Sequence, residues 1–142
     1  MLPTLLKQKS GRVVFVSSVA GLLGTQYRAS YSAAKAAIHM WANSLRAEVA
    51  KEGVEVSVVF PGFVKTNVSF NALNGEGKPQ GHQDEAIENG LEADVFAERV
   101  VSSLMAGDEY IVVGGKKEQL GVLVSRLSPS LLYKMIRKTR VK

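Results

Sequence analysis

Two short apolar runs separated by a long helical repeat constrain the fold of this chain most strongly. Residues 12–17 read Arg-Val-Val-Phe-Val-Ser, and residues 54–60 read Val-Glu-Val-Ser-Val-Val-Phe. Runs that are apolar at nearly every position, rather than at every second one, are typical of strands covered on both faces. Such strands occur in parallel sheets with helices on both sides. We therefore expect an α/β fold.

The segment between the two runs predicts a helix from Tyr31 to Glu52 that stops at Gly53. Its apolar residues recur at spacings of three and four and form one stripe that we expect to pack in the core: Ala34, Ile38, Trp41, Leu45 and Val49. A helical pattern over 91–106 and a strand pattern over 109–113 continue the alternation. This order predicts parallel βαβ units with right-handed crossovers.

The remaining segments predict shorter features. Residues 2–10 resemble the end of a helix, with Gly11 as its C-terminal cap. Residues 63–90 form a long, glycine-containing stretch, which is typical of a lid, a binding loop or a disordered segment. The pair Gly114-Gly115 follows a strand, but we expect neither a third glycine nor a helix N-terminus to complete a dinucleotide fingerprint there.

Composition limits the class of protein. A chain of 142 residues is long enough for one domain, which we place at 1–115, with a tail at 116–142. Without cysteine the chain has no disulfides and no thiolate chemistry, and it contains no secretory signal pattern. We expect a cytoplasmic location, or the cytoplasmic face of an intracellular membrane.

The positive charge of +5 lies in the tail. Residues 1–125 carry 12 basic and 13 acidic residues, whereas 126–142 carry six basic residues and no acidic one. A helix that begins with Ser128 as N-cap and Pro129 at its first position would be amphipathic and basic. Its basic face is a solvated surface, a membrane-surface helix or a nucleic-acid patch. A nucleic-acid patch lacks the aromatic interleaving expected of it, and of the other two we favour membrane-surface contact through 128–142 over the solvated surface.

The candidate catalytic residues are Tyr31, Lys35 and Ser18. Tyr31 and Lys35 are four residues apart, so their side chains share one helix face. A cation one turn away favours the phenolate and lowers the pKa of a tyrosine, whose ordinary value is about 10. The spacing taken alone is also compatible with an incidental pair, and Ser18 alone with a turn or capping serine. His39 and His82 have no acidic or cysteine partners at ligand spacing, so we expect no metal site.

In context, Ser18, the Tyr31-x-x-x-Lys35 pair and the turn Pro61-Gly-Phe-Val-Lys-Thr66 resemble the short-chain dehydrogenase/reductase superfamily. The loop from Asn71 and the basic tail are similar to the membrane-associated group around SDR family member 7. The resemblance implies a Rossmann-like doubly wound parallel sheet, of which this chain would supply the carboxyl-terminal portion, about three strands with flanking helices. It also implies an NAD(P)-dependent oxidoreductase that interconverts a carbonyl and an alcohol.

The resemblance further implies a role for each matched residue. Tyr31 would be the general acid or base, Lys35 would assist it and bind the nicotinamide ribose, and Ser18 would polarise the substrate carbonyl. The turn would contact the nicotinamide carboxamide through Pro61, Gly62, Val64 and Thr66. Phe63 and Phe70 would line a pocket for an apolar or lipid-like substrate.

The superfamily's Gly-rich phosphate loop precedes its serine strand and is not found in this sequence. We therefore expect the chain to be inactive alone. NADP is preferred over NAD by resemblance to the membrane-associated relatives. Helices 31–52 and 91–106 are expected to form a homodimer interface. The alternative is a non-catalytic truncated product that acts as an interaction or membrane-surface module.

Overall fold

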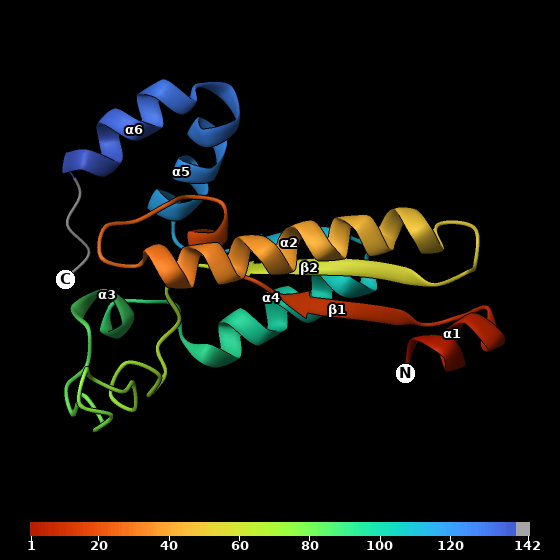
Figure 1. Cartoon of the computed structure of the whole chain (residues 1–142), viewed down its shortest axis with the longest axis horizontal. Coiled ribbons are helices and arrows are strands. Elements are labelled where there is room, and N and C mark those ends of the chain that lie inside the picture. The colour runs from red at the N-terminus through yellow and green to blue at the C-terminus, as the bar shows by residue number, and fades with distance from the viewer. Residues whose placement is uncertain (139–142) are drawn as a thin grey trace.

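A parallel three-stranded sheet forms the centre of the molecule (Figure 1). The computed structural model describes residues 1–138. The strands are β1 (Arg12–Val16), β2 (Glu55–Pro61) and β3 (Tyr110–Val113), in the order β1-β2-β3. Val13 pairs with Val56, and Val59 pairs with Ile111. The middle strand is the most deeply buried, because Val56, Val58 and Phe60 are 0% exposed. The α/β prediction is confirmed.

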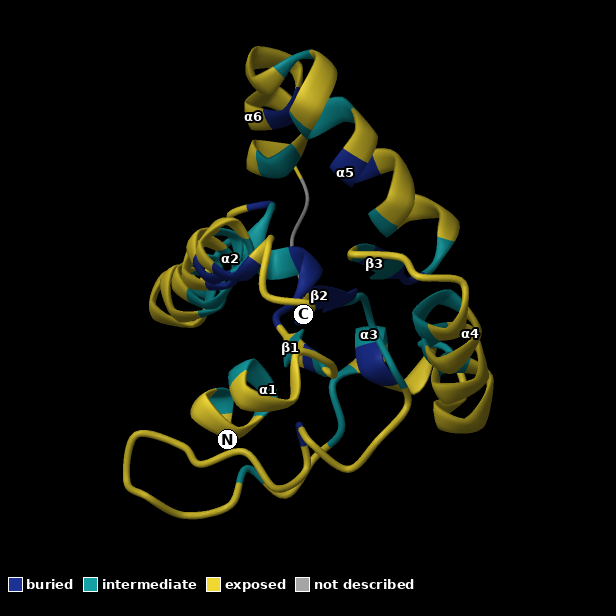
Figure 2. Cartoon of the chain, turned by 90° about the vertical axis from the view of Figure 1, so that its right-hand side faces the viewer, coloured by how far each residue is buried: buried dark blue, intermediate teal, exposed yellow. Residues whose placement is uncertain are grey.

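Helices cover both faces of this sheet (Figure 2). The short 3-10 turn η1 (Val19–Gly21) leads from β1 toward α2 (Ala29–Val49), which packs with α1 (Leu2–Gln8) against one face. The opposite face is covered by α4 (Ala93–Met105), whose Phe96, Val100 and Leu104 pack on Val59, Ile111 and Val113. Burial on both faces explains why the β2 run lacks alternation, whereas Val14 and Val16 of β1 are 39% and 56% exposed.

The apolar stripe of α2 matches the prediction at Leu45 and Val49 and departs from it at Trp41 and Ala34. Ala42, Leu45 and Val49 are buried, whereas Trp41 is 60% exposed and Ala34 is exposed. Trp41 meets the ring of Phe15 edge-on, with centroids 5.0 Å apart. Since β1 is an edge strand, Trp41 lies beside the rim of the sheet and not beneath it. The prediction that Trp41 and Ala34 pack in the core was wrong.

The cap of α1 also differs from the prediction. Lys9, not Gly11, adopts the left-handed conformation with φ 50°, and its N–H donates to the Leu6 carbonyl. Gly11 has φ 126°, and a Cβ there would lie 2.7 Å from Leu5 Cδ2. Because residues with a side chain rarely adopt this φ, Gly11 serves the backbone conformation with which the chain enters β1.

Two helices follow β3: α5 (Lys116–Leu127) and α6 (Pro129–Lys138). The sequence did not predict α5, which touches the core through Gly121 and Val122. The predicted α6 is present, and its Leu132 is 6% exposed and belongs to the main core with Val122. The boundary at residue 115 stays a prediction. Residues 139–142 of the predicted basic helix lie outside the described part of the chain.

Within residues 1–138, no helix combines the length and the apolar character needed to cross a bilayer.

Candidate active site

Ser18 lies where β1 leaves the sheet. It is 9% exposed, caps η1 by accepting a hydrogen bond from the Ala20 N–H (3.1 Å), and donates from Oγ to the Pro61 carbonyl (3.4 Å). The preceding Ser17 is 2% exposed and donates from Oγ to the Lys35 carbonyl (2.8 Å). These bonds hold the serine pair against both β2 and α2 at the carboxyl edge of the sheet.

Tyr31 and Lys35 lie in the first two turns of α2. The Lys35 Nζ is 5.7 Å from the centroid of the Tyr31 ring and donates to the Val16 carbonyl (3.2 Å). Lys35 thus contacts both the tyrosine and the end of β1, and Tyr31 is 45% exposed. Because Ser17 and Val16 contact Lys35, the strand end that carries Ser18 and the helix start that carries Tyr31 are brought together.

The Pro61–Thr66 turn begins at the same edge. The Gly62 N–H donates to the Val113 carbonyl (2.8 Å), and a Cβ on Gly62 would lie 2.9 Å from the Gly114 Cα. Val64 forms an isolated parallel bridge with Leu91. Pro61, Gly62, Phe63 and Val64 are therefore fixed at the carboxyl end of β2, beside Ser18.

Thr66 and Phe70 lie farther along, in the long loop. Both are exposed, Phe70 to 49%. The loop is folded and contains the short helix α3 (Glu85–Glu88), whose Ile87 is buried. A hydrogen bond to the Glu92 carboxylate raises the pKa of Lys65, which precedes Thr66.

Three residues that organise this region were not predicted: Arg28, Gln83 and Asp84. Arg28 Nη2 lies 2.9 Å from Asp84 Oδ2, and Gln83 Nε2 donates to the Thr66 carbonyl (2.5 Å). Single side chains that bond to groups distant in the sequence leave no periodic signal, so no pattern in the sequence could have identified them.

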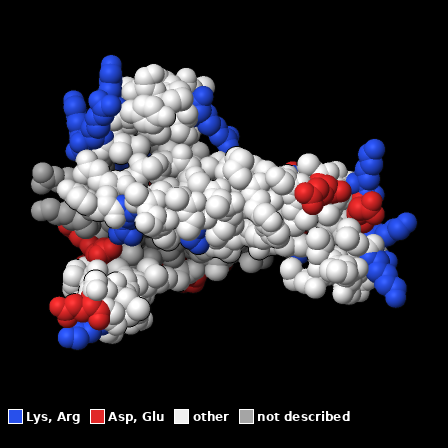
Figure 3. All heavy atoms as spheres, viewed as in Figure 1, with Lys and Arg blue, Asp and Glu red and all other residues white. Residues whose placement is uncertain are grey.

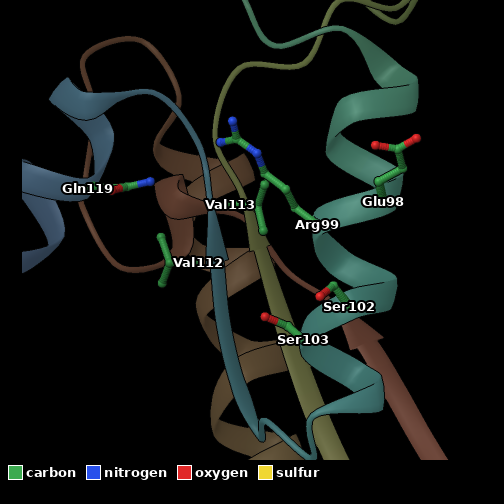
Figure 4. Close-up of a pocket in the computed structure, with 7 residues that line it drawn as sticks. All are labelled: Glu98, Arg99, Ser102, Ser103, Val112, Val113 and Gln119. Carbon is green, nitrogen blue, oxygen red and sulfur yellow. The ribbon is translucent and has the colours of Figure 1, made fainter.

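The surface of residues 1–138 includes two hollows that bear on the site. One, of about 500 Å³, is lined by residues 27–31 and so opens beside Tyr31. The other, of about 520 Å³, lies between α4, β3 and α5 and contains no predicted site residue. Figure 4 shows Ser103 of α4 and Gln119 of α5 pointing toward β3 from opposite sides of this second hollow. Of the predicted site residues, Tyr31 lines the first hollow.

A helix N-terminus does follow Gly114-Gly115, contrary to the prediction, because α5 begins at Lys116. A Cβ on Gly115 would lie 2.7 Å from Glu118 Oε2, so the Glu118 carboxylate already lies against this helix start. A carboxylate there opposes a phosphate group by like-charge repulsion. Among residues 1–138, no group of three His, Cys, Asp or Glu side chains is arranged to hold a metal ion.

Known proteins match the chain in sequence. It is 38% identical over its full length to a "Dehydrogenase/reductase SDR family protein 7-like" of Drosophila melanogaster, covering 44% of that relative. It is 33% identical over 96% of its length to a "Dehydrogenase/reductase SDR family member 7B" of Xenopus laevis, covering 42% of it. The chain thus spans less than half the length of these curated relatives.

Solved structures share the fold. A short chain dehydrogenase from Burkholderia cenocepacia in complex with NADP has a TM-score of 0.75 at 23% identity, over 98% of this chain and 52% of its own. A short chain dehydrogenase/reductase from Burkholderia phymatum in complex with NAD has a TM-score of 0.73 at 21% identity, over 92% of this chain and 52% of its own. Residues 1–76, more than half of the 142 residues, match the family model described as short chain dehydrogenase. The chain therefore belongs to the short-chain dehydrogenase family.

Proposed function

We propose that this chain carries the carbonyl-reacting half of an NAD(P)-dependent oxidoreductase that interconverts a carbonyl and an alcohol. The observation that carries the proposal is the meeting of the Ser18 strand end with the first turns of α2, through the Ser17 and Lys35 contacts. Those contacts put a hydroxyl, a phenol and an ammonium group at one edge of a parallel sheet, where open α/β sheets bind ligands.

Each side chain has a separate task in this proposal. The Tyr31 hydroxyl gives a proton to the substrate carbonyl oxygen during reduction and takes it back during oxidation. The Ser18 hydroxyl donates a hydrogen bond to the same oxygen, and its capping contact with Ala20 fixes its orientation. The Lys35 ammonium, 5.7 Å from the tyrosine ring, stabilises the negative charge that forms when the phenol loses its proton.

The residues present fit the nicotinamide side of the cofactor. The bridge between Val64 and Leu91 uses the Lys65 N–H and the Phe63 carbonyl, so the Val64 N–H and carbonyl point to the opposite side of the chain. Val64, the Thr66 hydroxyl and Lys35 would hold the nicotinamide and its ribose beside Pro61 and Gly62. A bound nicotinamide would supply the hydride. NADP is the preferred form, and the 142-residue chain alone is inactive in this proposal.

The substrate is proposed to be an uncharged, apolar carbonyl or alcohol. Phe63 and Phe70 would line the substrate pocket in this proposal, and the 49% exposed Phe70 offers a ring for apolar contact. Burial of apolar area gives such a ligand about 25 cal/mol per Å². An apolar substrate is therefore expected to bind more tightly than a charged one of equal size.

The test replaces the matching 44% of the Drosophila melanogaster relative with this chain, so that the sheet is complete. The expected result is NAD(P)H-dependent carbonyl reduction, which Tyr31→Phe lowers by about 10²- to 10⁴-fold. Tyr27→Phe is the matched control, because Tyr27 lines the same hollow but is 90% exposed. Equal activity of the two variants would refute the role of Tyr31.

A second candidate function is membrane-surface contact through 128–142, to which the exposed face of the preceding helix α5 is added here. Leu120, Leu123 and Leu127 recur at spacings of three and four on α5 and are 54%, 53% and 76% exposed. They lie on the helix face opposite Gly121 and Val122, which touch the core. Figure 3 shows Lys and Arg atoms projecting beside α6 with no Asp or Glu among them. An apolar stripe next to a basic face suits an anionic lipid surface.

Vesicle sedimentation tests this candidate. The chain is expected to bind vesicles that contain phosphatidylserine and to bind pure phosphatidylcholine weakly, and Leu123→Gln is expected to reduce that binding. Binding that is unchanged by Leu123→Gln would contradict the leucine stripe. Vesicle binding without NAD(P)H binding would favour the non-catalytic alternative.

We also propose a homodimer through α2 and α4. Their outer faces carry exposed apolar residues, including Met40 and Trp41 on α2 and Val101 and Met105 on α4. Light scattering of the completed protein tests this, and a strictly monomeric mass would contradict it.

A further inference from the structure

The loop from Val64 to Leu91 is closed at its base and open at its tip. At the base, Val64 bridges Leu91, and Gly90 lies so close to Phe63 that a Cβ would be 2.7 Å from the Phe63 carbonyl atoms. At the tip, nothing lies within 4 Å of the Cβ positions of Gly75 and Gly77. Contacts made by the residues that lie between the base and the tip must therefore set the position of the middle of the loop.

One carboxamide, that of Gln83, holds the segment 66–70. Its Oε1 accepts hydrogen bonds from Ser69 Oγ (2.7 Å) and from the Phe70 N–H (3.3 Å), and its Nε2 donates to the Thr66 carbonyl. Ser69 is 4% exposed, so its bond to Gln83 is partly shielded from water, whereas the bonds of Gln83 to Phe70 and Thr66 are exposed. Both residues proposed to meet ligands, Thr66 and Phe70, are thus oriented by the same side chain.

The next residue, Asp84, joins this network to α2. Its N–H donates to Ser69 Oγ (3.0 Å), and its Oδ1 accepts from Gln80 (3.1 Å). Its Oδ2 accepts from Arg28 Nη2 at 2.9 Å. The Asp84 side chain is 18% exposed, which protects this ion pair from full solvent screening.

Arg28 stands at the N-cap of α2, three residues before Tyr31. Its carbonyl accepts from the Ser32 N–H (2.8 Å), so its backbone belongs to the first turn of the helix. It also lines the hollow beside Tyr31. A change in the Arg28 and Asp84 contact therefore alters the spacing between the tyrosine and the 66–70 segment.

We propose that Arg28, Asp84 and Gln83 are positioning residues that set where the segment 66–70 stands relative to Tyr31. Asp84 binds the start of α2, Gln83 binds the segment, and the peptide bond between them transmits the position from one to the other. The structural part of this inference is independent of the reaction, and its functional part rests on the proposed function above.

The structural part is tested by hydrogen exchange and mass spectrometry on the 142-residue chain. Arg28→Gln removes the ion pair from the α2 side and leaves the loop sequence intact. We expect exchange in 66–72 and 80–84 to become about fivefold faster, the scale expected for a partly exposed ion pair. Arg28→Lys is expected to keep most of the protection, because it keeps the charge.

Glu92→Gln is the matched control. It removes the Lys65 ion pair, which has the same 2.9 Å separation but is more exposed and lies at the base of the loop. Protection of β2 reports in the same experiment that each variant is folded. Equal exchange in 66–72 for Arg28→Gln and Glu92→Gln would overturn the inference. If Arg28→Gln does not fold, Asp84→Asn is measured in its place. Faster exchange at 27–35 would support the inference, and unchanged exchange there would overturn it.

The functional part uses the completed protein described above. Arg28→Gln is expected to raise KM for the carbonyl substrate about fivefold and to change kcat less than twofold, because positioning of the substrate segment acts on binding. A loss confined to kcat would overturn this part. Faster exchange in a completed protein that shows no reductase activity would refute the proposed function while leaving the positioning contact intact.

Discussion

Gly21→Ala is expected to separate the serine strand end from α2. Gly21 ends η1 and faces α2, where a Cβ would lie 2.8 Å from the Lys35 carbonyl carbon, 3.0 Å from the Ala36 nitrogen and 3.0 Å from the Lys35 Cβ. Two of these three atoms are backbone, so a side-chain rotation cannot relieve the overlap. The helix and the turn must move apart.

The size of the effect follows from these distances. Ordinary van der Waals contact begins at 3.4 Å, so the 2.8 Å contact demands a shift of at least 0.6 Å. Overpacking of this kind costs about 1–3 kcal/mol of unfolding free energy. A misplacement approaching 1 Å in an active site costs up to about 10²-fold in rate. Because Ser17 bonds to the Lys35 carbonyl, the same shift stretches the contact that aligns Ser18.

Gly24→Ala is the matched control in the same loop. Nothing lies within 4 Å of its Cβ position, and its φ is not positive. The alanine should therefore leave stability unchanged or raise it by about 0.4–1 kcal/mol, by restricting the unfolded chain.

Urea unfolding at low protein concentration, followed by the fluorescence of the single tryptophan Trp41, measures both variants. With a slope of about 2 kcal/mol per M, a 2 kcal/mol loss lowers the midpoint by about 1 M for Gly21→Ala. A Gly21→Ala midpoint equal to that of Gly24→Ala would refute the reasoning from close approach.

The remaining predictions concern pH, a buried hydroxyl and the sheet edge. Burial, followed by the charges of Arg46 and Arg126, lowers the pKa of His39 below 6.5. The unfolded chain then binds a proton at His39 more readily than the folded chain, so the free energy of unfolding should fall as the pH drops below 6.5. His39→Gln should make that fall smaller, as measured by urea midpoints between about pH 5 and pH 7. Ser57 is 1% exposed and donates to the Asp108 carbonyl (2.9 Å), so Ser57→Ala should cost about 1 kcal/mol in the same assay. Val16 is 56% exposed on the edge strand β1, where unpaired strand edges can associate with one another. Val16→Lys should therefore reduce self-association of the chain in size-exclusion chromatography. Unchanged self-association would rule out the β1 edge as the contact.

The sheet and the helix α2 could be predicted because buried positions are occupied by apolar residues, which leave a recognisable pattern in the sequence. The run at 54–60 is apolar since β2 lies between two other strands and two helical layers. The helix α5 escaped prediction because its leucines point away from the core, while the core contact is made by Gly121 and Val122. A Gly at a contact position weakens the apolar period on which helix prediction depends.

The candidate site likewise contains residues that could be predicted from the sequence and residues that could not. Ser18, Tyr31 and Lys35 could be singled out because their chemistry depends on local spacing and on their places at the ends of predictable elements. The Arg28 and Asp84 pair joins residues 56 positions apart, and no spacing rule specifies such a contact. Trp41 was misplaced for a related reason, since periodicity indicates a helix face but not where the sheet beneath that helix ends.

The turn at Gly53 has a consequence for where foreign sequence can be inserted. Gly53 has φ 71°, and a Cβ there would lie 2.2 Å from the Lys9 carbonyl oxygen, so this turn is pressed against the turn that leads into β1. A fluorescent tag or peptide insert at that end would force apart the amino ends of β1 and β2. At the loop tip nothing lies within 4 Å of the Cβ positions of Gly75 and Gly77, so the tip offers a permissive place for labels that report on the chain without disturbing its sheet.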